Sequence, residues 1–151
     1  MGDRTWARVS VLAEHKAAAL RILDNICCGY GPVEGTTSLF VMEFEEANYG
    51  QIEELKQLEA AGIAFDHVWG PGDTFEGCTH YLRFTEDGEP DSTYIGDAEL
   101  SLTLHSLIDL TADPDALARY IREKYTATQP KPWDNQLEYG KRHQLRTLVT
   151  Q

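Results

Sequence analysis

Hydrophobic residues in the first third of the chain change spacing several times, and these changes predict strands and helices in alternation. From Thr5 to Leu12, apolar residues occupy every second position, which is typical of a half-buried strand. The alanine-rich stretch Glu14–Ile26 predicts a helix. The glycine-rich segment Gly29–Gly35 then predicts a loop, and the nearly continuous apolar run Ser38–Phe44 predicts a central strand covered on both faces.

The middle of the chain predicts one more helix followed by a series of strands. Leucines and isoleucines at helical spacing place the helix at Asn48–Gly62. Strands are predicted at Ala64–Trp69, at Thr79–Thr85 and within Ser92–Leu102. Asp87-Gly88 is a typical hairpin turn between the last two.

The last third predicts helices. Thr103 is expected to cap a short helix after a strand that ends near Leu102. Asp113-Pro114 is a strong helix start, with Asp113 as the N-cap and Pro114 at the first helical position. Two prolines make the segment 126–133 a linker, and a final helix is expected at Asp134–Leu148, although Gly140 weakens that prediction.

This order of elements predicts an α+β fold. We expect a mixed or antiparallel sheet of four to five strands with helices packed on one face, ferredoxin-like in outline. The length of 151 residues predicts a single domain. We assign residues 1–128 to the α+β domain and residues 129–151 to a Pro/Trp linker followed by a basic C-terminal helix or arm.

Negative charge is concentrated in the middle of the chain. The net charge is −12, yet residues 34–99 hold 16 acidic residues against Lys56 and Arg83, so the two flanking parts are nearly neutral. Direct binding to nucleic acid needs a basic surface, and an anionic membrane would repel this one. The charge therefore favours a basic protein surface as partner, and excludes direct nucleic-acid binding and membrane binding.

Cysteine use and hydropathy bear on the compartment. Three cysteines without a regular spacing argue against a disulfide framework. The N-terminal residues have no apolar core of the signal-peptide type, and no stretch of the sequence is long and apolar enough for a membrane span. A cytoplasmic protein is the expectation.

Four side chains around a glycine-rich loop are weak candidates for a metal site or a histidine base: His67, Asp73, Cys78 and His80. On a strand, however, His67 shares a face with Phe65 and Trp69, which favours packing over chemistry. The vicinal Cys27-Cys28 pair lacks a nearby base, and no loop matches a nucleotide-binding motif. The sequence thus implies no cofactor and favours a non-catalytic role over an enzyme.

The preferred hypothesis is an acidic binding protein that engages a basic protein surface. A narrower version is a DNA-mimic-like inhibitor of a nucleic-acid-binding defence or regulatory protein, which resembles this chain only in charge and size. The expected contact carboxylates lie on a helix and on a turn: Glu53, Glu54, Glu86, Asp87, Glu89 and Asp91. Exposed ion pairs contribute only about 0–1 kcal/mol each, so Trp69 or Trp133 would supply much of the specific energy.

Two alternatives remain open. One is a small-molecule-binding domain or small enzyme that uses the His/Asp/Cys cluster. The other is a homo-oligomeric structural module in which the basic tail meets the acidic middle of a neighbouring copy.

Overall fold

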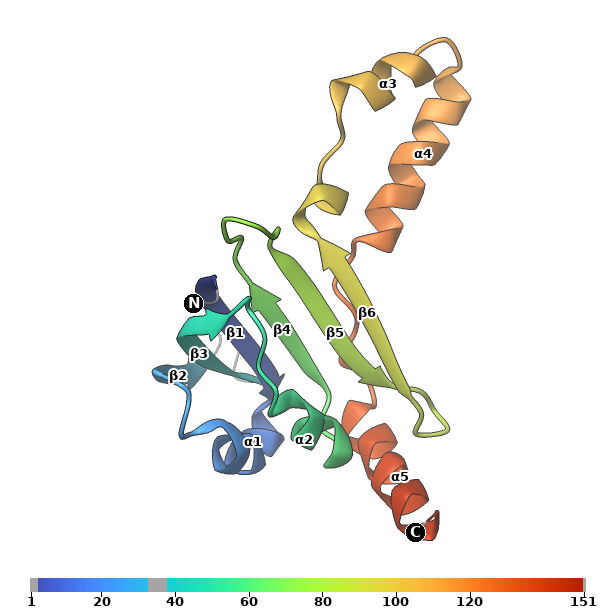
Figure 1. Cartoon of the computed structure of the whole chain (residues 1–151). Coiled ribbons are helices and arrows are strands. Elements are labelled where there is room, and N and C mark those ends of the chain that lie inside the picture. The colour runs from blue at the N-terminus through green and yellow to red at the C-terminus, as the bar shows by residue number, and fades with distance from the viewer. Residues whose placement is uncertain (1–2, 33–37, 151) are drawn as a thin grey trace.

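An antiparallel sheet of six strands forms the centre of the computed structural model, which describes residues 3–32 and 38–150 (Figure 1). The strands follow the order β2-β3-β1-β4-β5-β6 across the sheet. Their bounds are β1 Arg4–Leu12, β2 Gly29–Pro32, β3 Leu39–Asn48, β4 Phe65–Trp69, β5 Cys78–Phe84 and β6 Pro90–Gly96. The strands predicted at Thr5–Leu12, Ala64–Trp69 and Thr79–Thr85 are confirmed to within a residue or two.

The hydrophobic core lies on one face of this sheet. Alternate residues of β1, namely Ala7, Val9 and Val11, are almost fully buried, and each faces a buried apolar partner on β3. Two short helices cover these residues: α1 (Lys16–Leu23), which follows the 3-10 turn η1 (Ala13–His15), and α2 (Leu55–Ala60). The alternate apolar residues of β1 and the apolar sides of the two helices thus pack together in one hydrophobic layer.

The topology corrects the predicted fold in its details. The domain is a single α+β unit, but the sheet has six strands rather than four or five, and every described strand pair is antiparallel. Two β-α-β connections cross over a strand: β1 and β2, joined through α1, lie on either side of β3, and β3 and β4, joined through α2, lie on either side of β1. The ferredoxin-like outline stays a prediction, and β5 and β6 extend the sheet beyond these four strands.

The additional strand is β2, where the sequence predicts a loop. Gly29, Tyr30 and Gly31 pair with Glu43, Met42 and Val41 at the outer edge of β3. The segment lacks an alternating pattern, so it becomes a strand because β3 offers an unpaired edge. The rest of the predicted loop, residues 33–35, lies outside the described residues.

Two predicted helices and one predicted strand are shorter in the structure than the sequence pattern suggests. The helix predicted at Asn48–Gly62 is reduced to α2, because Tyr49 and Gly50 take positive φ angles of 53° and 70° and end β3 in a tight turn. The helix predicted at Glu14–Ile26 is reduced to η1 and α1. The strand predicted up to Leu102 ends at Gly96, and the 3-10 turn η2 (Asp97–Leu100) follows it.

Two helices project from the end of β6 as a hairpin that stands away from the sheet (Figure 1). They are α3 (Leu104–Leu110) and α4 (Pro114–Ala127), and neither contains a buried residue. Both predicted caps are confirmed: the Thr103 side chain accepts from the N–H of Ser106, and Asp113 accepts from two N–H groups of the first turn of α4. We call residues 101–128 the arm.

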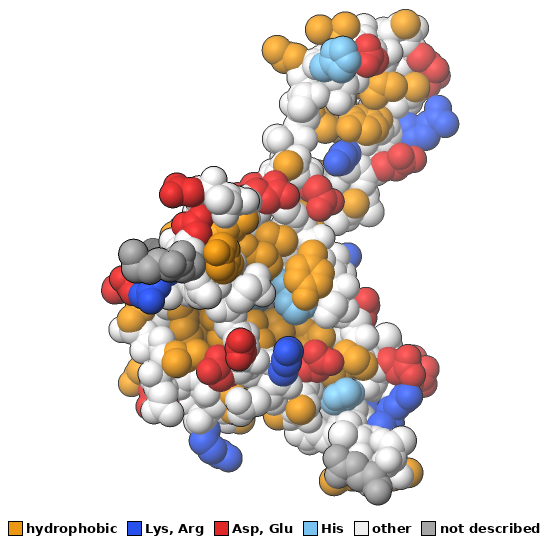
Figure 2. Space-filling view, in the orientation of Figure 1, with side chains coloured by type: hydrophobic (Ala, Val, Ile, Leu, Met, Phe, Trp, Pro, Cys, Tyr) orange, Lys and Arg blue, Asp and Glu red, His pale blue; other side chains and the backbone are white. Residues whose placement is uncertain are grey.

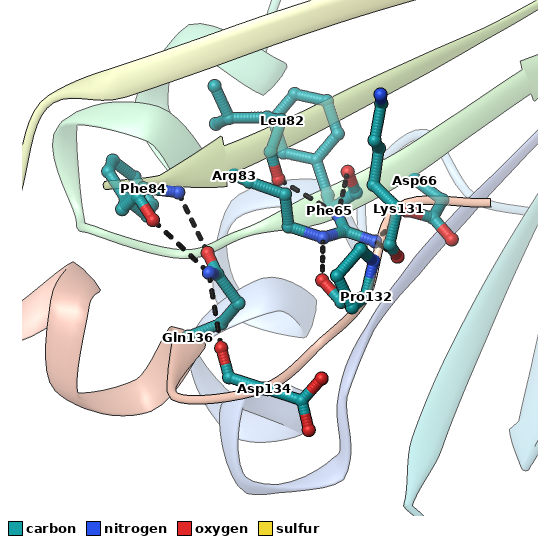
Figure 3. A network of polar contacts seen from close by, with 9 residues as sticks. All are labelled: Phe65, Asp66, Leu82, Arg83, Phe84, Lys131, Pro132, Asp134 and Gln136. Carbon is teal, nitrogen blue, oxygen red and sulfur yellow. Dashed lines mark hydrogen bonds and ion pairs between the residues drawn. The ribbon is translucent and has the colours of Figure 1, made fainter. Parts of the chain in front are cut away.

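The linker returns from the arm across the other face of β5 and is held there by Arg83 (Figure 3). The buried guanidinium uses its five N–H groups on the carbonyls of Phe65, Leu82, Lys131 and Pro132 and on a carboxylate oxygen of Asp66, at 2.7–3.1 Å. Its carbon also lies 3.8 Å from the centre of the Trp133 ring. Arg83 therefore joins three distant parts of the chain.

The final helix, α5 (Gln136–Val149), docks on the end of the sheet. The sequence pattern predicts this helix but not where it packs. The Gln136 amide accepts from the N–H of Phe84 and donates to its carbonyl oxygen, which extends the ladder of β5 (Figure 3). At Gly140 a Cβ atom would lie 1.9 Å from the carbonyl oxygen of Gly62, at the end of α2. Gly140 thus permits a close helix approach.

None of the helices in the described residues is both long and apolar enough to cross a membrane.

Candidate functional site

A β-bulge in β3 turns two consecutive glutamates toward solvent. Thr5 pairs with Ala47 and Ala7 pairs with Phe44, so Glu45 and Glu46 together stand opposite Trp6 alone. Phe44 and Ala47 are buried, whereas both glutamates are exposed. Without the additional residue, strict alternation would turn one of these carboxylates into the core.

The turn after β3 places two more glutamates close by. The positive φ angles of Tyr49 and Gly50 reverse the chain. A Cβ atom at Gly50 would lie 2.3 Å from the Trp69 ring, so glycine is needed for the chain to pass this close to the core. The residues that follow, Gln51–Glu54, come back along the end of β3 just before α2 begins.

These segments enclose a hollow of about 520 Å³, which we call the acidic hollow. Its lining combines carboxylates with apolar side chains, and none of its described residues is basic. The lining residues are Ile26, Cys28, Phe44, Glu45, Glu46, Ala47, Asn48, Gln51, Ile52, Glu53 and Glu54. A smaller hollow of about 190 Å³ shares Cys28, Phe44 and Glu45 with it and is also lined by Trp6 and Arg8.

Few of the glutamates in this region have a cationic partner. Glu46 pairs with Arg4, and Glu43 pairs with Arg8 at 3.5 Å, in both cases between exposed side chains. Glu45, Glu53 and Glu54 form no ion pair within the part of the chain that the structure describes. The hollow therefore keeps negative charge available to a ligand.

The acidic turn between β5 and β6 is already engaged by the chain itself. Arg146 pairs with Glu89 at 2.7 Å and donates to the carbonyl oxygen of Asp87, while Arg142 lies 4.0 Å from Glu86. The basic tail thus meets part of the acidic middle within one molecule. Among the carboxylates predicted as contacts, Glu53 and Glu54 lie at the hollow. Glu86, Asp87 and Glu89 lie beside α5 and remain exposed, and Asp91 is exposed on β6.

A third group of carboxylates lies at the base of the arm, where Figure 2 shows acidic side chains gathered between the sheet and the arm. Glu76 accepts from the N–H of Ala98, and Glu99 accepts from the N–H of Gly96. These groups orient the backbone at the end of β6. Most of the described acidic residues of the middle segment are accordingly distributed over three places on the molecule, whereas Asp66 is paired with the buried Arg83.

Both tryptophans predicted as partner anchors pack within the chain. Trp69 is 9% exposed and belongs to the core, and Trp133 packs against the core and the Arg83 guanidinium. Trp6 is instead 48% exposed, beside the hollow, and lies against Gly70. The sequence could have identified it, because the alternation in β1 places Trp6 on the face opposite Val9.

The two histidines of the predicted cluster are cross-strand neighbours on the core face of the sheet. His80 stacks on Tyr94, with ring centres 4.1 Å apart, and its Nε2 lies 3.1 Å from the Ser92 hydroxyl. Burial lowers the pKa of both His67 and His80 to about 4. Both rings are thus neutral at pH 7 and pack in the core.

The other two candidates do not complete a site with them. Asp73 lies in the loop after β4, where its N–H donates to the Asp3 carboxylate. Burial raises the pKa of the Cys78 thiol, which keeps it protonated. Within residues 3–32 and 38–150, no three His, Cys, Asp or Glu side chains are placed to hold a metal ion.

No family model matches the chain, and no curated protein or solved structure shows significant similarity to it.

Proposed function

We propose that this protein is a non-catalytic acidic binding protein, and that the acidic hollow receives a basic segment of a partner protein. The observation that carries the proposal is the combination of four glutamates and an apolar floor in one hollow that lacks a described basic residue. This combination supports the expectation, drawn from charge, of a basic protein partner. The proposal centres the contact on the bulge in β3.

The chemistry of the lining matches lysine or arginine side chains. Ile26, Phe44 and Ile52 offer apolar surface for an aliphatic stem, while the glutamates at the rim accept from the cationic head. The exposed Trp6 ring, beside the smaller hollow, is a surface on which a guanidinium can stack. A volume of about 520 Å³ is large enough for side chains of this size.

The net charge of −12 adds attraction at long range. A negatively charged protein raises the rate at which a basic partner arrives, and this effect falls as salt rises. The short-range contacts in the hollow then determine where the partner stays. We therefore expect two separate effects: the affinity should fall as salt rises, and it should fall when residues of the hollow are changed.

The proposal is tested with a fluorescein-labelled peptide of alternating arginine and serine residues, titrated by fluorescence anisotropy. The variant Glu45→Gln/Glu53→Gln removes two charges at the hollow, and Glu86→Gln/Glu89→Gln removes two at the β5–β6 turn. At about 0.7 kcal/mol per exposed pair, the two lost charges should make the hollow variant bind roughly tenfold more weakly, and the turn variant should lose less than twofold. Equal losses in the two variants, or affinity that is indifferent to salt, would overturn the proposal.

The narrower DNA-mimic hypothesis stays a prediction. It requires carboxylates spaced along an elongated surface, comparable to the phosphates of a duplex. Competition between this protein and duplex DNA for a basic DNA-binding protein tests that version. If the variant Glu45→Gln/Glu53→Gln competes as well as wild type, the surface that imitates DNA lies elsewhere on the molecule.

A further inference from the structure

The arm exposes large apolar side chains on both of its helices. Leu104 and Ile108, one turn apart on α3, are 78% and 65% exposed, and Ile121 and Tyr125, one turn apart on α4, are 41% and 66% exposed. Figure 2 shows hydrophobic side chains spread over the visible face of the arm. A two-helix hairpin without a buried residue leaves its apolar stripes uncovered.

We propose that the arm is a homodimerisation surface, on which the arm of a second copy of this chain completes a four-helix bundle. Two hairpins that cover each other's stripes form the usual packing unit of such a bundle. A twofold axis makes the contact self-complementary, so one exposed surface serves both copies.

Charge favours a second copy at this place over other parts of the surface. The chain carries −12, but residues 101–128 hold four acidic and three basic residues, so the arm is nearly neutral. Two copies repel one another least where they meet through their arms.

The amount of apolar surface predicts a reversible dimer. Leu100 and Leu102, at 60% and 37% exposed, continue the stripe toward the sheet. Six such side chains offer apolar surface on the order of a few hundred Å². A stable interface buries about 800 Å² per partner, so we expect dissociation in the micromolar range.

The experiment is sedimentation equilibrium of the full chain over a range of concentrations. Wild type should form a dimer, and Ile108→Ser/Ile121→Ser should raise the dissociation constant at least tenfold. The control Leu145→Ser/Leu148→Ser changes two side chains on α5 that are 63% and 71% exposed, and it should leave the dimer intact. A monomer at every concentration, or a dimer that only the α5 variant disrupts, would overturn the proposal.

Discussion

The two buried histidines make the stability of the fold depend on pH between their ordinary pKa and their folded pKa. His67 and His80 titrate near 6.5 when unfolded, and burial lowers both pKa values to about 4 in the folded chain. The unfolded state therefore binds more protons in this window, so the free energy of unfolding falls as the pH falls from about 6.5 toward 4. Above pH 7 the contribution is fully present.

The magnitude follows from the same two pKa values. A group that titrates at 6.5 when unfolded and at about 4 when folded costs about 2 kcal/mol at pH 5 relative to pH 8. The urea dependence of a domain this size is about 1–3 kcal/mol per molar, so each histidine lowers the urea midpoint by about 1 M over this range. Burial also raises the pKa of Asp66, which acts in the opposite direction and is common to all variants compared.

The assay is urea unfolding of wild type and His80→Phe at several pH values from 8 to 5. Phenylalanine keeps the ring that stacks on Tyr94 but does not titrate. The variant should lose about 2 kcal/mol of the difference in unfolding free energy between pH 8 and pH 5, whatever its absolute stability. The control His105→Gln changes an exposed ring on α3 and should keep the wild-type slope. A slope in His80→Phe equal to that of wild type would refute the reasoning.

Two further predictions concern the docking of the C-terminal segment. Gly140→Ala should destabilise the protein by about 1–3 kcal/mol because its Cβ meets the Gly62 carbonyl, although helix propensity alone predicts a gain of about 1 kcal/mol. Lys141→Ala, at an exposed position, should change stability by less than about 0.5 kcal/mol, and a stabilised Gly140→Ala would contradict this packing. Arg83→Met should cost about 3–5 kcal/mol at pH 7 by leaving the Asp66 carboxylate buried without its partner. The cost should shrink as the pH is lowered toward 4, because burial raises the pKa of Asp66 and favours its neutral form, and a cost in thermal unfolding that does not change with pH would argue against this role.

Elements whose residues alternate or carry a cap could be predicted from the sequence. The strand at β1, the strand at β4 and the start of α4 at Asp113-Pro114 depend on local patterns that the structure keeps. The class of fold follows from these elements. The number of strands does not, because β2 forms only where β3 leaves an edge to pair with.

The candidate site could be predicted only in part. Glu53 and Glu54 were expected as contacts, but Glu45 and Glu46 reach the hollow through a bulge that depends on the pairing of β1 with β3. The break in alternation between Phe44 and Ala47 is the one local sign of it. The pairing of Glu89 with Arg146 depends on where α5 docks, and no local pattern specifies that.

The most direct test of the central claim is a residue-resolved NMR titration of the ¹⁵N-labelled protein with the same arginine–serine peptide. If the acidic hollow binds basic segments, the largest amide shifts will fall on Phe44–Asn48 and Gln51–Glu54. Shifts centred on residues 86–91, or spread evenly over all exposed carboxylates, would contradict the account.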